Sequence, residues 1–164
     1  MRAVIRSSVA AGAALAILAA GQAQALQRAD VHALDALLQR ALDLSQSLTE
    51  AAGAQLKTGG ESADLACLET LRDAAGQVSD QLKDVRDVTD LATRLRGPVD
   101  RWRGIASVRR AAAGALAVLP IEARQTDQTA KLCGPDAGAR AKLLDALIGD
   151  ATTELTQLRG PAKS

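Results

Sequence analysis

Residues 62–96, SADLACLETLRDAAGQVSDQLKDVRDVTDLATRLR, carry the clearest structural signal in the chain. Their apolar side chains recur with strict heptad spacing at Leu68, Leu71, Ala75, Val78, Leu82 and Val85. The row continues with a small drift through Val88, Leu91 and Leu95. Such spacing places one apolar stripe along a helix, and that stripe must be buried against other helices. The segment is therefore predicted to be a long amphipathic helix that ends at Gly97-Pro98, where Pro98 is well placed to start the next helix.

Two further segments have the same periodicity, and no segment has the alternation of a strand. Residues 30–56 are predicted to be a helix with Asp30 as a candidate N-cap. Its seam consists of Leu34, Leu37, Ala41, Leu44, Leu48 and Ala51. Residues 136–159 are predicted to be the last helix, with Asp136 as a candidate cap. Its stripe consists of Leu144, Leu147, Ile148, Ala151, Leu155 and Leu158.

Residues 98–119 are predicted to be a helix that Pro120 ends. The positions expected to face inward are Val99, Trp102, Ile105 or Ala106, Ala112, Leu116 and Leu119. The small residues 111–115, including Gly114, are expected to let a neighbouring helix approach closely. Residues 121–132 fit either a short helix or a packed connection.

Four amphipathic helices with mostly short links predict an all-α fold, an up-down four-helix bundle. An open or extended helical arrangement is the alternative, because the second helix is longer than the others. In the bundle, Cys67 and Cys133 lie at the same end, which predicts a disulfide between them. The bond would close a loop of about 67 residues and stabilise the fold by roughly 4 kcal/mol. Two buried free thiols are the alternative.

The first 25 residues have the pattern of a secretory signal peptide. Arg2 and Arg6 precede an apolar run from Val9 to Ala20, and Ala23-Gln24-Ala25 forms a small-x-small cleavage site. The run of 12 residues is shorter than the roughly 20 that span a membrane, so we expect cleavage near Ala25 and no stable membrane span. An uncleaved anchor is the alternative.

Cleavage would leave residues 26–164, a single all-helical domain of 139 residues. Loss of the two leader arginines changes the formal net charge from +1 to −1. We expect the domain to be periplasmic or secreted, and an even pair of cysteines suits that oxidising compartment. A near-neutral charge gives no general attraction to nucleic acid.

Missing residue types exclude several classes of function. The chain has no Phe and no Tyr, and Trp102 is its single aromatic residue. Sugar platforms, single-strand base stacking and cages for quaternary amines need aromatic faces. His32 is the single histidine, so no ligand set for haem or a metal centre is complete, and we predict no cofactor and no metal. We expect His32 to be an exposed polar residue.

No arrangement of residues predicts catalysis. The sequence has no Gly-rich phosphate loop, and Gly59-Gly60 is a connection between helices. A Ser/His/Asp arrangement would have to use His32, in the first turn of a helix. We therefore predict no enzymatic activity and no catalytic residues.

The second helix is densely acidic on its polar face, with eight acids between Glu61 and Asp90. Asp80, Asp84 and Asp87 lie on one side of it and could in principle hold a hard cation. Because helix-surface carboxylates without a loop rarely form such a cage, we expect a solvated face instead.

Six arginines around the Gly97-Pro98 break form the one local charge anomaly. They are Arg94, Arg96, Arg101, Arg103, Arg109 and Arg110, opposed within these 17 residues only by Asp100. With Trp102 as an interfacial anchor, they are a candidate docking patch for an acidic partner or a lipid head group. The favoured alternative is structural. Trp102, in step with Val99 and Ile105, would face the core, and the arginines would pair with the acidic helix.

These observations predict an exported helical bundle that acts by binding another macromolecule. The partner would be another envelope protein, and the role that of an adaptor, a chaperone-like protein, or an inhibitor or immunity protein. A carrier that holds a lipid or other apolar ligand between its helices is the alternative, and a hydrolase with unidentified carboxylates is a third. A homodimer is compatible with the heptad seams.

Overall fold

The computed structural model describes residues 26–59 and 62–161, which form four helices. Helix α2 spans Arg28–Thr58, α3 spans Ser62–Arg94, α4 spans Pro98–Leu132 and α5 spans Pro135–Arg159. The predicted all-α fold class is confirmed. The predicted signal peptide and its cleavage site lie outside the described residues.

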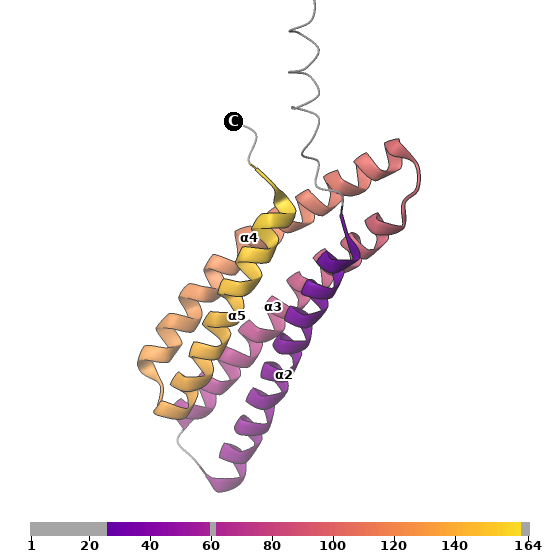
Figure 1. Ribbon diagram of the computed structural model, residues 1–164. Coiled ribbons are helices and arrows are strands. Elements are labelled where there is room, and N and C mark those ends of the chain that lie inside the picture. Colours follow the sequence, from indigo (N-terminus) through magenta and orange to yellow (C-terminus); the bar gives the residue numbers. More distant parts are fainter. Residues whose placement is uncertain (1–25, 60–61, 162–164) are drawn as a thin grey trace, which may run out of the picture.

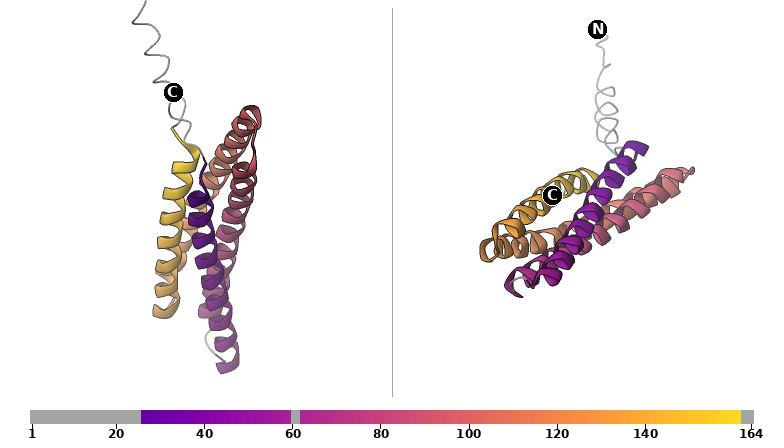
Figure 2. Two further views of the ribbon diagram at one scale, coloured as in Figure 1. Left: turned by 45° about the vertical axis from the view of Figure 1, so that its right-hand side comes forward. Right: turned by 90° about the horizontal axis from the view of Figure 1, so that it is seen from below.

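The four helices form the predicted up-down bundle (Figure 1). Helix α2 packs against α3 and α5, and α4 packs against the same two helices. Within the described ranges α2 and α4 do not contact each other, so they occupy opposite corners. The turn between α3 and α4 projects beyond the body of the bundle (Figures 1 and 2). This projecting end brings together the start of α2, the end of α3 and the start of α4.

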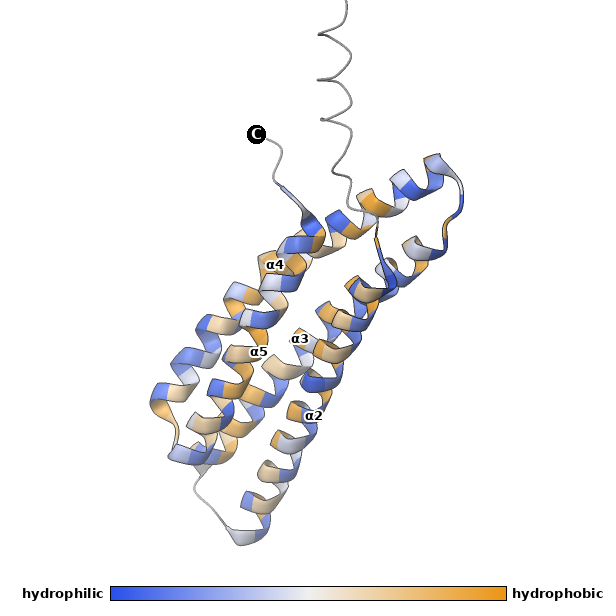
Figure 3. Cartoon of the chain, viewed as in Figure 1, coloured by the Kyte–Doolittle hydropathy of each residue, from blue (hydrophilic) through white to orange (hydrophobic). Residues whose placement is uncertain are grey.

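The predicted seam of α3 is buried along its strictly spaced part. All six residues from Leu68 to Val85 that were predicted to face inward are at most 2% exposed. The apolar surfaces of the helices accordingly face the interior of the bundle (Figure 3). Beyond Val85 the prediction is wrong for Leu91, which is 63% exposed, while Thr89 and Ala92 are buried. A straight helix has 3.6 residues per turn, so a row spaced at 3.5 drifts off the buried face.

The seams of α2 and α5 also follow the predicted patterns. All six residues predicted for the stripe of α5 are buried. In α2 the seam is buried from Leu34 to Leu48, and Ala52 then replaces Ala51 as the buried residue of the last turn. The spacing of apolar residues therefore identifies the buried faces of these two helices.

The N-terminal caps differ from the predictions at two helices. Helix α2 begins before Asp30, which is the third helical residue and accepts the Gln27 backbone N–H at Oδ2, 2.7 Å away. This contact belongs to a capping box, which satisfies an N–H group that the helix leaves free. Helix α5 begins at Pro135 after Gly134, so Asp136 lies in the first turn and does not cap it. A carboxylate in that turn still interacts favourably with the helix dipole.

Helix α4 is longer than predicted, because it continues through Pro120 to Leu132. Residues 121–132 are therefore its C-terminal third and not a separate element. A proline inside a helix removes one backbone hydrogen bond and costs on the order of 3 kcal/mol. The buried seam nevertheless runs from Leu119, before the proline, to Glu122 and Thr126 after it, so packing of this face against α3 and α5 offsets the cost.

The buried face of α4 follows the prediction at Ala112 and Leu119 but differs from it in the first turns of the helix. Trp102 is 70% exposed and Val99 is 60% exposed, whereas Gly104 and Val108 are buried. A Cβ atom on Gly104 would lie 2.8 Å from Leu95 Cδ1 and 3.1 Å from Ala92 Cβ, so glycine favours this close approach of α4 to α3 and a larger residue would displace the Leu95 side chain. Trp102 stands about 200° around the helix from Gly104 and consequently points outward.

The small residues 111–115 contribute less than predicted to close packing. Ala112 and Ala115 are buried in the seam. Gly114 is exposed, and a Cβ atom there would meet nothing within 4 Å. The close approach that was expected at Gly114 is made instead by Gly104, which lies nearer to the start of α4 and to the projecting turn.

A disulfide joins Cys67 of α3 to Cys133, which directly follows α4, with the two Cα atoms 6.1 Å apart. The predicted bond is thus present, and neither cysteine is free. Next to it, Asp64 Oδ1 accepts the Gly134 backbone N–H at 3.2 Å. The disulfide and this hydrogen bond together attach the start of α5 to the start of α3.

Glu122 and Thr126 are buried polar residues within the seam of α4, at 4% and 1% exposure. Among the described residues, neither Glu122 Oε2 nor Thr126 Oγ1 has a hydrogen-bond partner. Burial raises the pKa of the Glu122 carboxyl above its usual range, because the charged form loses its solvation. These two side chains differ from the buried Thr89, whose hydroxyl donates to the Val85 backbone carbonyl at 2.7 Å.

Replacing both Cys67 and Cys133 with serine is expected to lower the free energy of unfolding by about 2 to 5 kcal/mol, because the unfolded chain regains the freedom that the disulfide removes. Urea denaturation of the oxidised protein and the double variant measures the difference. In the wild-type protein, alkylation after denaturation without reductant should modify no thiol. Two alkylated cysteines would contradict the bond.

The Glu122→Gln variant is expected to be more stable than the wild-type protein at pH 7 by about 1 to 3 kcal/mol. A raised folded-state pKa means that Glu122 contributes its stability in full below the unfolded-state pKa, and loses it as pH rises through the folded-state pKa. The stability difference should therefore grow as pH rises from about 4 towards neutrality.

Urea denaturation of both proteins across this pH range measures that difference. Glu69→Gln makes the same neutralisation at an exposed position of α3 and serves as the control. A Glu122→Gln curve that runs parallel to the wild-type curve at every pH would show that the buried carboxyl has no such role.

Candidate functional site

A cleft of about 650 Å³ lies at the projecting end of the bundle. Helix α2 contributes its first two turns, α3 its last three, and the turn and start of α4 close the third side. The charged side chains that line it are Arg28, Asp35, Arg86, Asp90, Arg94, Arg96 and Arg101. Five arginines thus face two aspartates, and Val31 and Leu95 add apolar wall. The cleft is consequently positive in a protein whose overall charge is close to zero.

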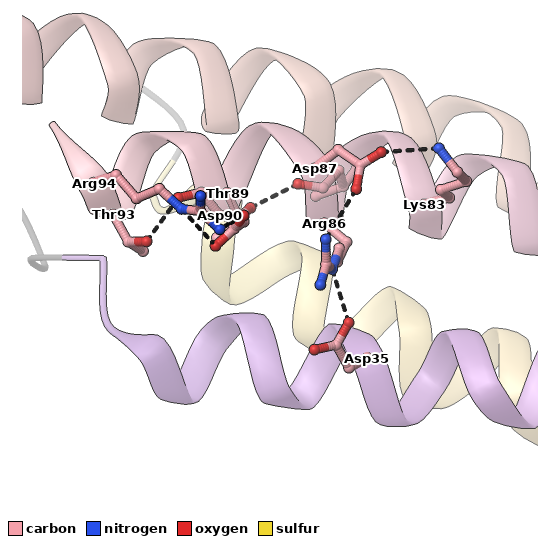
Figure 4. A network of polar contacts seen from close by, with 9 residues as sticks. Asp35, Lys83, Arg86, Asp87, Thr89, Asp90, Thr93 and Arg94 are labelled. Atoms are coloured by element: carbon pink, nitrogen blue, oxygen red, sulfur yellow. Dashed lines mark hydrogen bonds and ion pairs between the residues drawn. The ribbon is translucent and has the colours of Figure 1, made fainter.

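Arg86 forms the floor of the cleft and links two helices. Its Nε donates to Asp35 Oδ1 of α2 at 2.8 Å, and its Nη1 donates to Asp87 Oδ1 at 3.2 Å (Figure 4). These hydrogen bonds, the one to Asp35 first, raise the pKa of Arg86. Hydrogen bonds from Lys83 and then Arg86 lower the pKa of Asp87. Arg86 is therefore neutralised by its neighbours and holds α2 against α3.

Arg94 is neutralised within its own helix. Its Nη2 lies 2.6 Å from Asp90 Oδ2, one turn earlier on α3 (Figure 4). The Thr93 hydroxyl donates to the Asp90 backbone carbonyl at 2.7 Å. Both aspartates of the cleft are thus already engaged, one by Arg86 and the other by Arg94.

The remaining three arginines of the cleft have no carboxylate partner among residues 26–59 and 62–161. They are Arg28, Arg96 and Arg101, and all three are exposed. Arg101 donates from Nε to the Leu95 backbone carbonyl at 3.2 Å, which holds its side chain across the turn between α3 and α4. The cleft therefore presents three uncompensated guanidinium groups that can bind carboxylate or phosphate.

The structure divides the six predicted arginines among three places. Arg94, Arg96 and Arg101 line the cleft. Arg103 and Arg110 are exposed on α4, outside the cleft. Arg109 lines a smaller cavity of about 190 Å³ between α4, the start of α2 and the end of α5. Sequence reasoning missed Arg28 and Arg86, because they join the site only when α2 packs on α3. The sequence offered one indication of their role. Arg28 lies at the start of the first predicted helix, and Arg86 lies near the end of the helix that Gly97-Pro98 terminates.

The structural interpretation of the arginines and Trp102 is wrong. Trp102 is exposed and does not pack in the core. Of the six predicted arginines, Arg94 alone pairs with an acid of α3; Arg103, Arg109 and Arg110 form no ion pair within the part of the chain that the structure describes. The reason is the register of α4, which buries Gly104 and Val108 and turns the basic positions away from α3.

The other polar candidates lie as predicted. His32 is exposed, and it lines the cleft beside Arg28. Asp80 and Asp84 are exposed on the solvated face of α3. In the described ranges, no group of three or more His, Cys, Asp or Glu side chains is arranged to hold a metal ion.

Comparison with protein-family models, with curated proteins and with solved structures finds no match to this chain. A function for this protein must therefore be inferred from its fold and from the geometry of the cleft.

Proposed function

We propose that this protein is an exported, non-catalytic binding module whose cleft receives an acidic segment of another envelope protein. One observation carries the proposal. Arg28, Arg96 and Arg101 converge on one cleft and have no carboxylate partner among the described residues. An acidic segment would supply the missing charges.

The cleft suits carboxylates held on a chain. Guanidinium groups bind carboxylates through paired N–H donors, and Val31 and Leu95 offer apolar surface for the aliphatic parts of glutamate side chains. Exposed arginines lose side-chain freedom when they bind, so a single small anion recovers little free energy. Several carboxylates on one segment share that cost. A macromolecular partner is therefore favoured over a small metabolite.

The leader pattern and the cysteines together support the proposed compartment. The pattern of residues 1–25 supports export, and a disulfide persists in an oxidising compartment. The partner would accordingly be a periplasmic or secreted protein with an exposed acidic segment. An adaptor, or an inhibitor of an envelope enzyme, would bind in this manner.

The lipid-carrier alternative receives less support from the same geometry. The cleft has a charged lining, which an apolar ligand would have to desolvate. Leucines without solvent exposure, such as Leu34, Leu82 and Leu144, occupy the space between the helices. A lipid tail could enter there only by displacing packed side chains.

The Arg28→Glu, Arg96→Glu double variant tests the proposal. Neither arginine makes an ion pair with a described residue, so the melting temperature should stay within about 2 °C of the wild-type value. Affinity for the partner should fall at least about 30-fold, as expected when buried arginine contacts are lost and replaced by repulsion. Crosslinking pull-down from the exported fraction identifies the partner, and titration with the purified partner measures the affinity.

Arg103→Glu, Arg110→Glu is the matched control, with the same change of charge outside the cleft. It should bind the partner within about threefold of the wild-type affinity, because only weak long-range attraction changes. Equal loss in both double variants would point to overall charge and contradict a cleft-specific site. Failure of the wild-type protein to capture any protein would also overturn the proposal.

A further inference from the structure

The outer face of α4 is an apolar surface that the bundle does not use. Val99, Trp102 and Ile121 are 60%, 70% and 52% exposed. At about 100° per residue they lie on the side opposite the buried Val108 and Ala115. Ala113 and Ala117 are exposed between them on the same side. A narrow apolar strip thus runs along α4 from the projecting turn past its middle.

The composition of α4 sets it apart from the other helices. It is the one described helix with a stretch that is long and apolar enough to cross a membrane by length and composition. Only 28% of that stretch is buried in the bundle. A core helix of a soluble protein passes the same test when it is mostly buried, and α4 is not. Part of the apolar surface of α4 is therefore open to solvent.

The charges beside the strip have one sign. From Arg101 to Ile121 the sequence contains four arginines and no acid. Arg103 and Arg110 are exposed next to Trp102 and Ala113, and neither forms an ion pair with any residue of 26–59 or 62–161. At about 100° per residue, Arg103 and Arg110 lie on the same side of α4 as the strip. The outer face of α4 therefore mixes exposed apolar and basic side chains, a composition that suits binding to an anionic membrane interface.

We infer that the outer face of α4 binds the surface of an anionic lipid bilayer. Val99, Ile121 and the alanines would enter the boundary between head groups and acyl chains, and Arg103 and Arg110 would bind lipid phosphates. Trp102 would lie at the head-group level, where tryptophan is enriched. The helix would lie flat in the interface and keep its packing on α3 and α5, so the bundle would stay folded.

The charge of this face favours a bilayer over a second copy of the chain. Self-association through this face would bring Arg103 and Arg110 of both copies together, with no acid between residues 101 and 121 to compensate them.

Trp102 makes the test direct, because it is the only aromatic residue of the chain. The N-terminus of the exported protein is first determined by mass spectrometry. The protein is then titrated with vesicles of phosphatidylcholine alone and with vesicles that also contain about 30 mol% phosphatidylglycerol, which gives them a negative surface charge. We expect the Trp102 emission to shift to shorter wavelength only with the anionic vesicles. The shift should weaken as salt is added.

The Arg103→Gln, Arg110→Gln variant should bind the anionic vesicles roughly 20-fold more weakly, since each arginine near a charged surface contributes about fivefold. Lys57→Gln, Lys142→Gln removes the same charge from α2 and α5 and should bind within about threefold of the wild-type protein. The cleft variant Arg28→Glu, Arg96→Glu should still show the Trp102 shift, which separates this surface from the cleft.

Three results would overturn the inference. The first is a Trp102 emission that anionic vesicles leave unchanged at low salt. The second is an equal loss of vesicle binding in the arginine and lysine variants. The third is a Trp102 emission that shifts to shorter wavelength without vesicles, by an amount that increases with protein concentration. The last would identify a second copy of the chain as the occupant of the face, which sedimentation equilibrium would confirm.

Discussion

Burial of the apolar seam of α3 is the constraint on which the rest of the structure depends. The seam from Leu68 to Val85 packs against α2 on one side and α4 on the other, and it meets α5 across the bundle. Near its end, Gly104 leaves room for the close approach of α4 to Leu95 and Ala92. That contact sets the rotation of α4 and thereby exposes Trp102.

The two ends of the bundle are held differently. At one end the disulfide, the hydrogen bond from Gly134 to Asp64, and contacts of Arg140 with Ser47 tie α5 to α3 and α2. The other end lies about 40 Å away along α3, at 1.5 Å per residue. There the polar bridge from Arg86 to Asp35 joins α2 to α3, and the turn after α3 projects freely. The cleft occupies this less restrained end.

Charge is distributed so that the cleft and the outer face of α4 keep separate basic groups. The acids of α3 neutralise Lys83, Arg86 and Arg94, which are all on that helix. Arginines on the turn, on α4 and at the start of α2 lie beyond reach of those acids. The net charge of the whole chain is close to zero, yet two local surfaces are positive: the cleft and the outer face of α4. A protein that lies on a membrane through one of them could present the other to a partner.

The sequence by itself determined the helical class, the number of helices, their buried faces in α2, α5 and most of α3, and the disulfide. These follow from local spacing, because a heptad row can be buried in only one way along a helix. It did not determine the rotation of α4, whose short apolar residues match several registers equally well. Close contact at Gly104 decided it, as packing past Pro120 decided its length. The cleft likewise required the tertiary structure, since Arg28 and Arg96 are far apart in the sequence and meet only when α2 packs beside the end of α3.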